Sequence, residues 1–335
     1  MRVRMTVGGA AFALLIWSSL AGPAALEAQV TGPGPDGRWP LQPSAPGGRT
    51  LAPFMEGWYA NEDGSFSVSF GYLNLNSDTL YIPVGEDNFL EPAQFNGMQP
   101  TVFFPGHHRG LFTAELPAEM RDTDVWWTLT KSNGDVTKVP GRATSNAYEL
   151  DWVPRPHGSM HALVSFDSQD GAGRGPPGLL AEQTETVSVG DPVTLSITAM
   201  DPSERDEDDF RFAETMPLRV VWSQLQGPGS VEYSRHESNP LPEPEEEEEP
   251  DSAAAAAIAA AGPAAAAAFR RRRGPPGPEV IPLAEGEGTA RVIVTFSVPG
   301  EYLFLAKVDN FSAADSGDGD QCCWTNGFVR VSVTP

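Results

Sequence analysis

The chain has 335 residues and a formal net charge of −23, with 45 acidic side chains against 22 Lys and Arg. This charge excludes nucleic acid and anionic membrane surfaces as partners, because both would repel the protein. Once an N-terminal segment is set aside, the remaining length suits two domains of ordinary size, each able to bury its own core.

The N-terminus begins with the basic segment MRVRM, followed by the apolar run TVGGAAFALLIWSSLAG and the small-residue segment PAALEA. This order is typical of a secretory signal peptide, and we predict residues 1–28 as the signal, cleaved after Ala28. The alternative is a membrane anchor, but the run is shorter than the about 20 residues of a span and contains Gly8, Gly9 and Gly22. We therefore expect a secreted or periplasmic protein whose mature chain has no transmembrane segment.

Residues 29–50 are rich in Pro and Gly and are predicted to form a linker. Residues 51–166 contain short runs of alternating apolar and polar residues bounded by turn residues, among them SFSVSFGYLNL, GLFTAELP, DVWWTLTK and HALVSF. A period of two indicates antiparallel strands, so we predict a β-sandwich, with a β-barrel as the alternative. The segment PFMEGWYANEDGSFSVSFGYLNLN resembles exported bacterial β-proteins without an assigned activity, which implies a β-fold and no site residues.

A second Pro/Gly-rich segment, residues 167–184 with DGAGRGPPG, is predicted to be another linker. Residues 185–335 then contain the strands expected of an immunoglobulin-like sandwich, namely TETVSV, PVTLSITAM, LRVVWSQL, SVEYS, TARVIVTFSV, EYLFLAKV and FVRVSVTP. The predicted fold class is therefore all-β, with two antiparallel β-sandwich domains of the immunoglobulin-like kind.

The second domain also carries motifs of a known family, Val-x-Trp in LRVVWSQLQGPGSVEYS and Pro-Gly-x-Tyr in ARVIVTFSVPGEYLFLAKVDN. With GDPVTLSITAMDP before them and VRVSVTP after them, residues 185–335 resemble the polycystic-kidney-disease (PKD) type of immunoglobulin-like domain. Where that family has Trp-Asp-Phe-Gly-Asp-Gly, this chain has the stretch from Val221 to Gly229. The resemblance implies contact with proteins or carbohydrates.

Residues 236–288 form a low-complexity insertion in the second domain, with PLPEPEEEEEP, two alanine runs and FRRRRGPPGP. Glu245–Glu249 precede the alanines and Arg270–Arg273 follow them, the order that complements a helix dipole. Gly262 and Pro263 divide the alanine tract into pieces shorter than the about 12 residues that an isolated helix needs. We predict a disordered insertion; a partner-docking arm is the alternative.

The sequence contains no catalytic motif: no Gly-x-Ser-x-Gly segment follows a strand, and the β pattern lacks the helix that such a nucleophile turn requires. A catalytic pair of carboxylates remains an alternative, because the distance between two carboxylates in the folded protein cannot be read from a sequence. His107 and His108 are adjacent, whereas His157 and His161 on one strand would lie about 13 Å apart, too far to share a metal ion. We expect these histidines in exposed loops rather than at a zinc or copper site.

Aromatic residues of the first domain provide a candidate ligand site. Trp126 and Trp127 are adjacent, so on a strand their side chains point to opposite faces. Both are candidate residues of a sugar-stacking surface, since aromatic faces bind the apolar faces of sugars. The alternative is packing in the core, which the spacing by two of Phe66, Val68 and Phe70 indicates for their own strand.

Cys322 and Cys323 are the only cysteines, and exported thiols are usually paired. Consecutive Cα atoms stand about 3.8 Å apart, closer than the about 4.4 to 6.8 Å of ordinary disulfides, so a bridge between neighbours requires a turn. The segment SGDGDQ before the pair and Asn326-Gly327 after it supply one. We predict a vicinal disulfide; two separate thiols, an intermolecular bridge and a metal site are the alternatives.

Three acidic connections of the second domain are expected at one end of the sandwich. One of them holds the glutamate run, and the other two hold the candidate metal ligands Asp201, Asp206, Asp208, Asp309, Asp315, Asp318 and Asp320. A calcium ion, which takes about 6 to 8 oxygen ligands, would relieve their mutual repulsion. No loop matches a full calcium-binding pattern, and a solvated acidic tip is the alternative.

These features predict an exported, non-enzymatic binding protein of the cell envelope or the extracellular space, with a protein or carbohydrate partner. It needs no cofactor other than the candidate calcium ion. One alternative is a carbohydrate-binding accessory protein that uses the exposed aromatic residues of the first domain. A hydrolase with an unrecognised carboxylate site is a further alternative.

Overall fold

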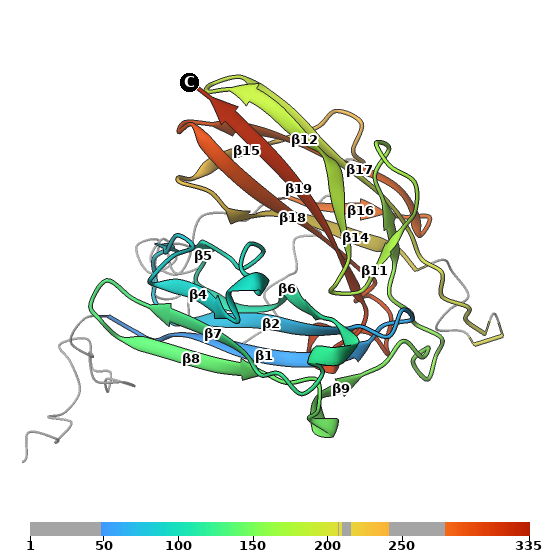
Figure 1. Cartoon of the computed structure of the whole chain (residues 1–335). Coiled ribbons are helices and arrows are strands. Elements are labelled where there is room, and N and C mark those ends of the chain that lie inside the picture. Colours follow the sequence, from blue (N-terminus) through green and yellow to red (C-terminus); the bar gives the residue numbers. More distant parts are fainter. Residues whose placement is uncertain (1–47, 207, 210–215, 241–278) are drawn as a thin grey trace, which may run out of the picture. The chain divides into compact units, whose positions relative to one another are not determined.

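The computed structural model describes residues 48–206, 208–209, 216–240 and 279–335. The predicted signal peptide, nearly all of the predicted linker 29–50 and most of the insertion lie outside these residues. The described residues form strands and short 3₁₀ turns without an α-helix, so the fold is all-β as predicted (Figure 1). The first strand begins at Leu51, where the first domain was predicted to begin.

The first half of the described chain contains a sheet with the strand order β6-β2-β1-β9, a three-stranded sheet β4-β7-β8 and the pair β3-β5. The strand bounds are β1 Leu51–Ala60, β2 Phe66–Asn74, β3 Leu80–Tyr81, β4 Asn88–Glu91, β5 Val102–Phe103, β6 Gly106–Leu116, β7 Val125–Thr130, β8 Val136–Gly141 and β9 Glu149–Leu150. The 3₁₀ turns are η1 Ala93–Phe95, η2 Ala118–Met120 and η3 Asn146–Tyr148. All ladders here are antiparallel except the short parallel pair of β1 and β9.

Alternation in β2 explains how this half builds its core. Val68, Phe70 and Tyr72 are buried in one apolar cluster, whereas Ser67 and Ser69 lie on the opposite face of the strand. The same cluster contains apolar residues of the three-stranded sheet, so the two sheets pack face to face.

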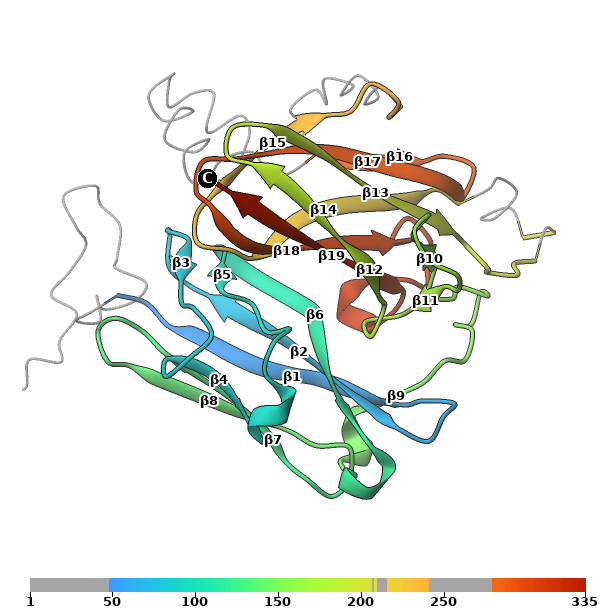
Figure 2. The ribbon, with the colours of Figure 1, turned by 45° about the horizontal axis from the view of Figure 1, so that its top comes forward.

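The second half contains two five-stranded sheets with the orders β11-β10-β13-β17-β15 and β12-β19-β18-β14-β16 (Figure 2). The bounds are β10 Leu163–Ser165, β11 Gly173–Arg174, β12 Leu179–Ser188, β13 Pro192–Met200, β14 Leu218–Gln226, β15 Val231–Arg235, β16 Val280–Leu283, β17 Glu287–Phe296, β18 Gly300–Asp309 and β19 Trp324–Thr334, with the turn η5 Asp318–Asp320. The six strands predicted from PVTLSITAM onward are all present. The order matches an immunoglobulin-like sandwich, with β12 parallel to the last strand β19.

The linker predicted at residues 167–184 is wrong, because this segment contains β11 and most of β12. Its glycines form a tight buried turn: Gly175 has φ +67° and Gly178 has φ +63°, a region that L side chains rarely adopt. A Cβ on Gly178 would also collide with the backbone of Asn326. Pro and Gly here serve close packing rather than chain mobility.

Two predicted boundaries also differ from the structure. The first domain was predicted to extend to residue 166, but β10 pairs with β13 and therefore belongs to the second half. The insertion was predicted to extend to residue 288, but β16 pairs with β14, and β17 begins at Glu287. In both cases a short strand adds to a sheet whose main strands lie elsewhere in the sequence.

Each half has its own apolar cluster, as predicted, but the cluster of the first half also takes in four side chains of the second half, Leu225, Leu303, Leu305 and Phe328. Phe304 of β18 lies in the core between the two sheets of the second half. The neighbouring residues Leu303 and Leu305 point the other way, into the cluster that contains Trp127 of the first half. Residues 47–335 accordingly form one compact unit.

Candidate functional site

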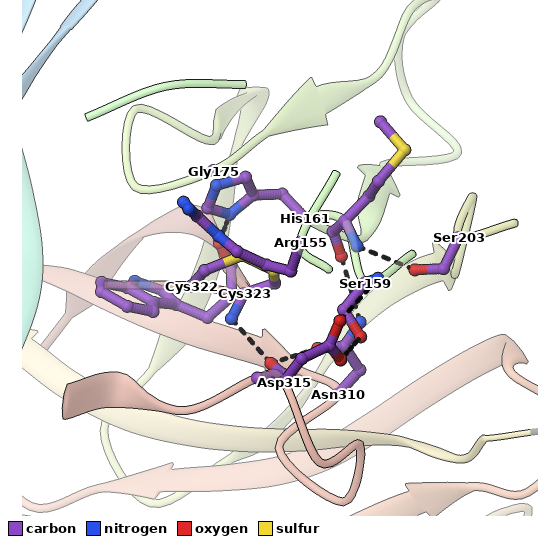
Figure 3. The surroundings of a disulfide bond; sticks show 12 residues. Arg155, Ser159, His161, Gly175, Ser203, Asn310, Asp315, Cys322 and Cys323 are labelled. Atoms are coloured by element: carbon purple, nitrogen blue, oxygen red, sulfur yellow. Dashed lines mark hydrogen bonds between the residues drawn. A yellow bond between two sulfur atoms is a disulfide. The ribbon is translucent and has the colours of Figure 1, made fainter. Parts of the chain in front are cut away.

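Cys322 and Cys323 form a disulfide directly before β19, and both side chains are almost fully buried, with exposed fractions of 1% and 0% (Figure 3). Their Cα atoms are 3.0 Å apart and the peptide bond between them is cis. The Cys323 backbone N–H donates to Ser316 Oγ at 2.8 Å, and Ser316 donates to Asn310 Oδ1 at 2.6 Å. Backbone hydrogen bonds between Cys322 and Gly317 close the turn.

Asp315 ties this turn to a loop that precedes β10 (Figure 3). Its carboxylate accepts hydrogen bonds from the backbone N–H of His157 at 2.7 Å and from Ser159 Oγ at 2.6 Å. Arg205 donates to the same Ser159 hydroxyl at 3.2 Å. Burial acts to raise the pKa of Asp315, but these hydrogen bonds outweigh it and hold the pKa below its ordinary value. The disulfide turn is therefore fixed by a polar network that spans three loops.

His161 lies under this network and is buried, with 2% of its surface exposed. Its Nδ1 donates to the carbonyl oxygen of Trp324 at 3.0 Å. The rings of Tyr59 and Trp152 stack on each other at 4.4 Å and contact the imidazole edge-on. Burial lowers the pKa of His161 to about 4, so the imidazole is neutral at pH 7. The expectation of an exposed loop is wrong for His161, because these aromatic rings cover it.

Glu56 is a second buried titratable group at the contact between the halves. Its Oε2 accepts hydrogen bonds from Gln321 Nε2 at 2.8 Å and from Arg109 at 3.3 Å. Burial raises the pKa of Glu56, and these two partners offset only part of that effect. The carboxyl group thus links β1 to the loop that carries the disulfide.

The structure does not assemble the predicted calcium site. Asp309 pairs with Arg219 at 2.8 Å, and Asp201 pairs with Arg205 at 2.9 Å. Asp315 is held as described above, Asp206 accepts the backbone N–H of Asp208, and Asp318 and Asp320 lie in η5. Residues 48–206, 208–209, 216–240 and 279–335 contain no group of three His, Cys, Asp or Glu side chains that could hold a metal ion. Arginines pair with Asp201 and Asp309, and hydrogen bonds hold Asp315. The glutamate run lies outside the described residues.

The aromatic and histidine residues considered as candidate binding residues also differ in position from what was expected. Trp127 is fully buried and donates from Nε1 to Asn88 Oδ1 at 3.0 Å, so its assignment to a binding surface is wrong. Trp126 is half-buried on the opposite face, and Lys138 Nζ lies over its ring at 4.8 Å from the centroid. His107 and His108 lie on β6 rather than in a loop. The Lys138 ammonium group thus lies over the Trp126 ring, where a sugar was expected to stack.

A hollow of about 310 Å³ lies between β12 and β13 on one side of the second half. Its buried lining is formed by Phe166, Ala181, Leu195 and Val329, and the partly exposed lining by Asp167, Ser168, Gln183, Glu185, Thr194 and Ser196. The hollow arises because β10 is short and the chain then crosses to the other sheet as β12. Sequence reasoning missed it, since the segment that causes the crossing was interpreted as a linker.

Comparisons with known proteins identify no family for this chain. No family model and no curated protein matches the chain. Among solved structures, the D00-D0 domain of intimin is similar at 10% identity over 85% of this chain and 100% of that chain, with a TM-score of 0.23. The D0-D1 domain of intimin is 10% identical over 84% and 100%, with a TM-score of 0.22. A crystal structure of a protein of unknown function from Porphyromonas gingivalis W83 is 8% identical over 84% and 98%, with a TM-score of 0.23.

At these TM-scores the likenesses carry no argument, and the fold class rests on the strand pairing described above. In the part of the chain that the structure describes, no helix is long and apolar enough to cross a membrane.

Proposed function

We propose that this is an exported, non-enzymatic binding protein of the periplasm or the extracellular space, and that it holds a partner protein through the second half of the chain. The observation that carries the proposal is the hollow between β12 and β13, which combines an apolar floor with a polar rim. Binding sites on proteins typically have this combination, since the floor supplies burial and the rim supplies orientation.

Two features support a location outside the cytoplasm. The N-terminal sequence has the basic, apolar and small-residue segments of a secretory signal. A disulfide between Cys322 and Cys323 is in keeping with an oxidising compartment, where such bonds persist.

The surroundings of the titratable groups support a non-enzymatic role. The groups with strongly shifted pKa values, such as His161 and Tyr59, are packed inside the protein and do not line the hollow. The hollow itself is lined by two serines and two carboxylates without a histidine that could act as a base. Its chemistry therefore fits recognition better than bond cleavage.

A capture experiment tests the proposal. The purified protein is immobilised, exposed to solubilised envelope and to secreted proteins, and bound proteins are identified by mass spectrometry and retested in pure form. We expect a specific protein whose affinity falls at least tenfold in Gln183→Trp, which places a bulky ring in the hollow, and stays unchanged in Val136→Ala, on β8.

A glycan array with the same protein addresses the carbohydrate alternative. Specific glycan binding that is lost in Trp126→Ala, together with no dependence on Gln183, would overturn the proposal in favour of a sugar-binding role for the first half.

A further inference from the structure

The β13 strand is paired along its whole length on one side only. All nine of its residues pair with β17, but β10 pairs only with Thr198, Ala199 and Met200. Within the described chain, no strand pairs with Pro192–Ile197 on the β10 side. Because ladder groups alternate between the two sides of a strand, this stretch presents unpaired N–H and C=O groups.

This open edge lacks the features that usually block strand edges. Proteins protect such edges with charged residues, internal prolines or bulges. The sequence of β13, PVTLSITAM, contains no charged residue, and its only proline is the first residue. Its ladder with β17 has no register shift. This edge therefore has no bulge, no internal proline and no charged side chain to keep another strand away.

The hollow adjoins this edge. Leu195 of β13 and Ala181 of β12 contribute to its buried lining, and β12 is itself the last strand of its sheet. The charged residues of the lining are Asp167 and Glu185, and no Lys or Arg is among them. An incoming strand would therefore meet an apolar recess flanked by negative charge.

We propose that Pro192–Ile197 binds an extended segment of the partner protein in which apolar residues alternate with Lys or Arg. The segment adds to the β13 edge as a new strand, so that main-chain hydrogen bonds give affinity. An apolar side chain enters the hollow, and the basic side chains face Asp167 and Glu185. This inference rests on the proposed function and names the chemistry of the partner at the same site.

Synthetic peptides test the inference without the natural partner. The probe is a fluorescein-labelled, acetylated and amidated heptapeptide, Lys-Val-Lys-Val-Lys-Val-Lys, measured by fluorescence anisotropy against the purified protein. We expect it to bind at least tenfold more tightly than the matched peptide with Glu in place of Lys. A version with N-methyl groups on alternate residues along one edge should lose binding, because it cannot complete the ladder.

Variants of the hollow give the matched controls. Gln183→Trp should weaken binding of the basic peptide at least tenfold. Asp167→Lys combined with Glu185→Lys should reverse the preference in favour of the acidic peptide. Glu232→Lys, an exposed charge reversal on β15, should change neither.

Equal binding of both peptides, or binding of the basic peptide that persists in Gln183→Trp, would overturn the inference. If a captured partner loses affinity in Gln183→Trp but binds the Asp167→Lys, Glu185→Lys variant as tightly as the unchanged protein, the basic incoming strand is overturned, whereas the proposed binding through the hollow stands. Sedimentation that shows a concentration-dependent dimer abolished by Gln183→Trp would also overturn it, because a second copy would then occupy the edge.

Discussion

His161 shows how a single side chain can couple the stability of this protein to pH. It is a buried imidazole whose Nδ1 donates to the Trp324 carbonyl, and charging it would require desolvating a cation among aromatic rings. Burial lowers its pKa from 6.5 to about 4. Between these two values the unfolded chain binds a proton that the folded protein does not bind.

We predict that the free energy of unfolding falls as the pH decreases from 6.5 towards 4, with a loss of about 3 kcal/mol from His161 at the lower end. Substitution of His161 by Asn keeps a donor near the Trp324 carbonyl and removes the titration. Urea unfolding at several pH values should show a flatter dependence in His161→Asn than in the unchanged protein. The exposed control His107→Asn should retain most of the slope; equal slopes in all three proteins would contradict the prediction.

The turn before β19 is the element in which the two cysteines matter most. Asn310, Ser316 and Asp315 hold its backbone and link it to the loop before β10. The sulfur atoms of Cys322 and Cys323 lie inside this network, with almost no surface exposed. A reductant or an alkylating reagent therefore reaches them only when the turn opens.

We predict that the folded protein resists alkylation by iodoacetamide, even after treatment with millimolar dithiothreitol. The same treatment in guanidinium chloride should label both cysteines. Mass spectrometry of intact protein measures the label, and unfolded protein without reductant is the control, in which no thiol should react. Two labelled cysteines in that control would show that the chain carries free thiols instead of a bridge.

At the scale of the whole described molecule, β18 connects the two halves, because it is buried on both faces. Its side chains alternate between the core of the second half and the cluster shared with the first half. Hydrogen bonds add to this packing: the Thr101 N–H donates to the Leu225 carbonyl at 3.0 Å, and the Asn326 side chain donates from Nδ2 to the Gly110 carbonyl at 2.7 Å. The two halves are thus expected to lose their structure together.

We predict a single cooperative transition in calorimetry of the intact protein. Leu305→Ala, which removes packing against the first half, should lower the stability by about 2 to 5 kcal/mol and should keep a single transition. Val136→Ala, at a position that is 61% exposed, is the control and should have little effect. Two separate transitions in the unchanged protein would show that the halves unfold independently.

Periodicity predicted those strands that face a single core. On β13, Leu195, Ile197 and Ala199 point inward as their alternation requires. On β18 the run Tyr-Leu-Phe-Leu-Ala is continuous, a pattern typical of strands covered on both faces. The run therefore indicated that β18 is covered on both faces, but the alternation in the neighbouring strands led to its assignment to a single sandwich.

The candidate sites were harder to predict, because they depend on which groups meet in space. Adjacent Trp126 and Trp127 do point to opposite faces, as expected, but only the fold decides that Trp127 is the buried one. The carboxylates of Asp201 and Asp309 acquire arginine partners, one within its own loop and one from a different strand. The glycines of the predicted linker have the same composition as a mobile tether, and only their positive φ values distinguish a packed turn.

The burial of β18 on both faces also limits where the coding sequence of this protein could be divided. A gene fragment that encodes only the second half would expose Leu303, Leu305 and Phe328 to water. A fragment that encodes only the first half would lack these same side chains from its apolar cluster. We therefore expect a division of the coding sequence within residues 51–335 to give pieces that fold poorly, so that both halves are needed in one chain.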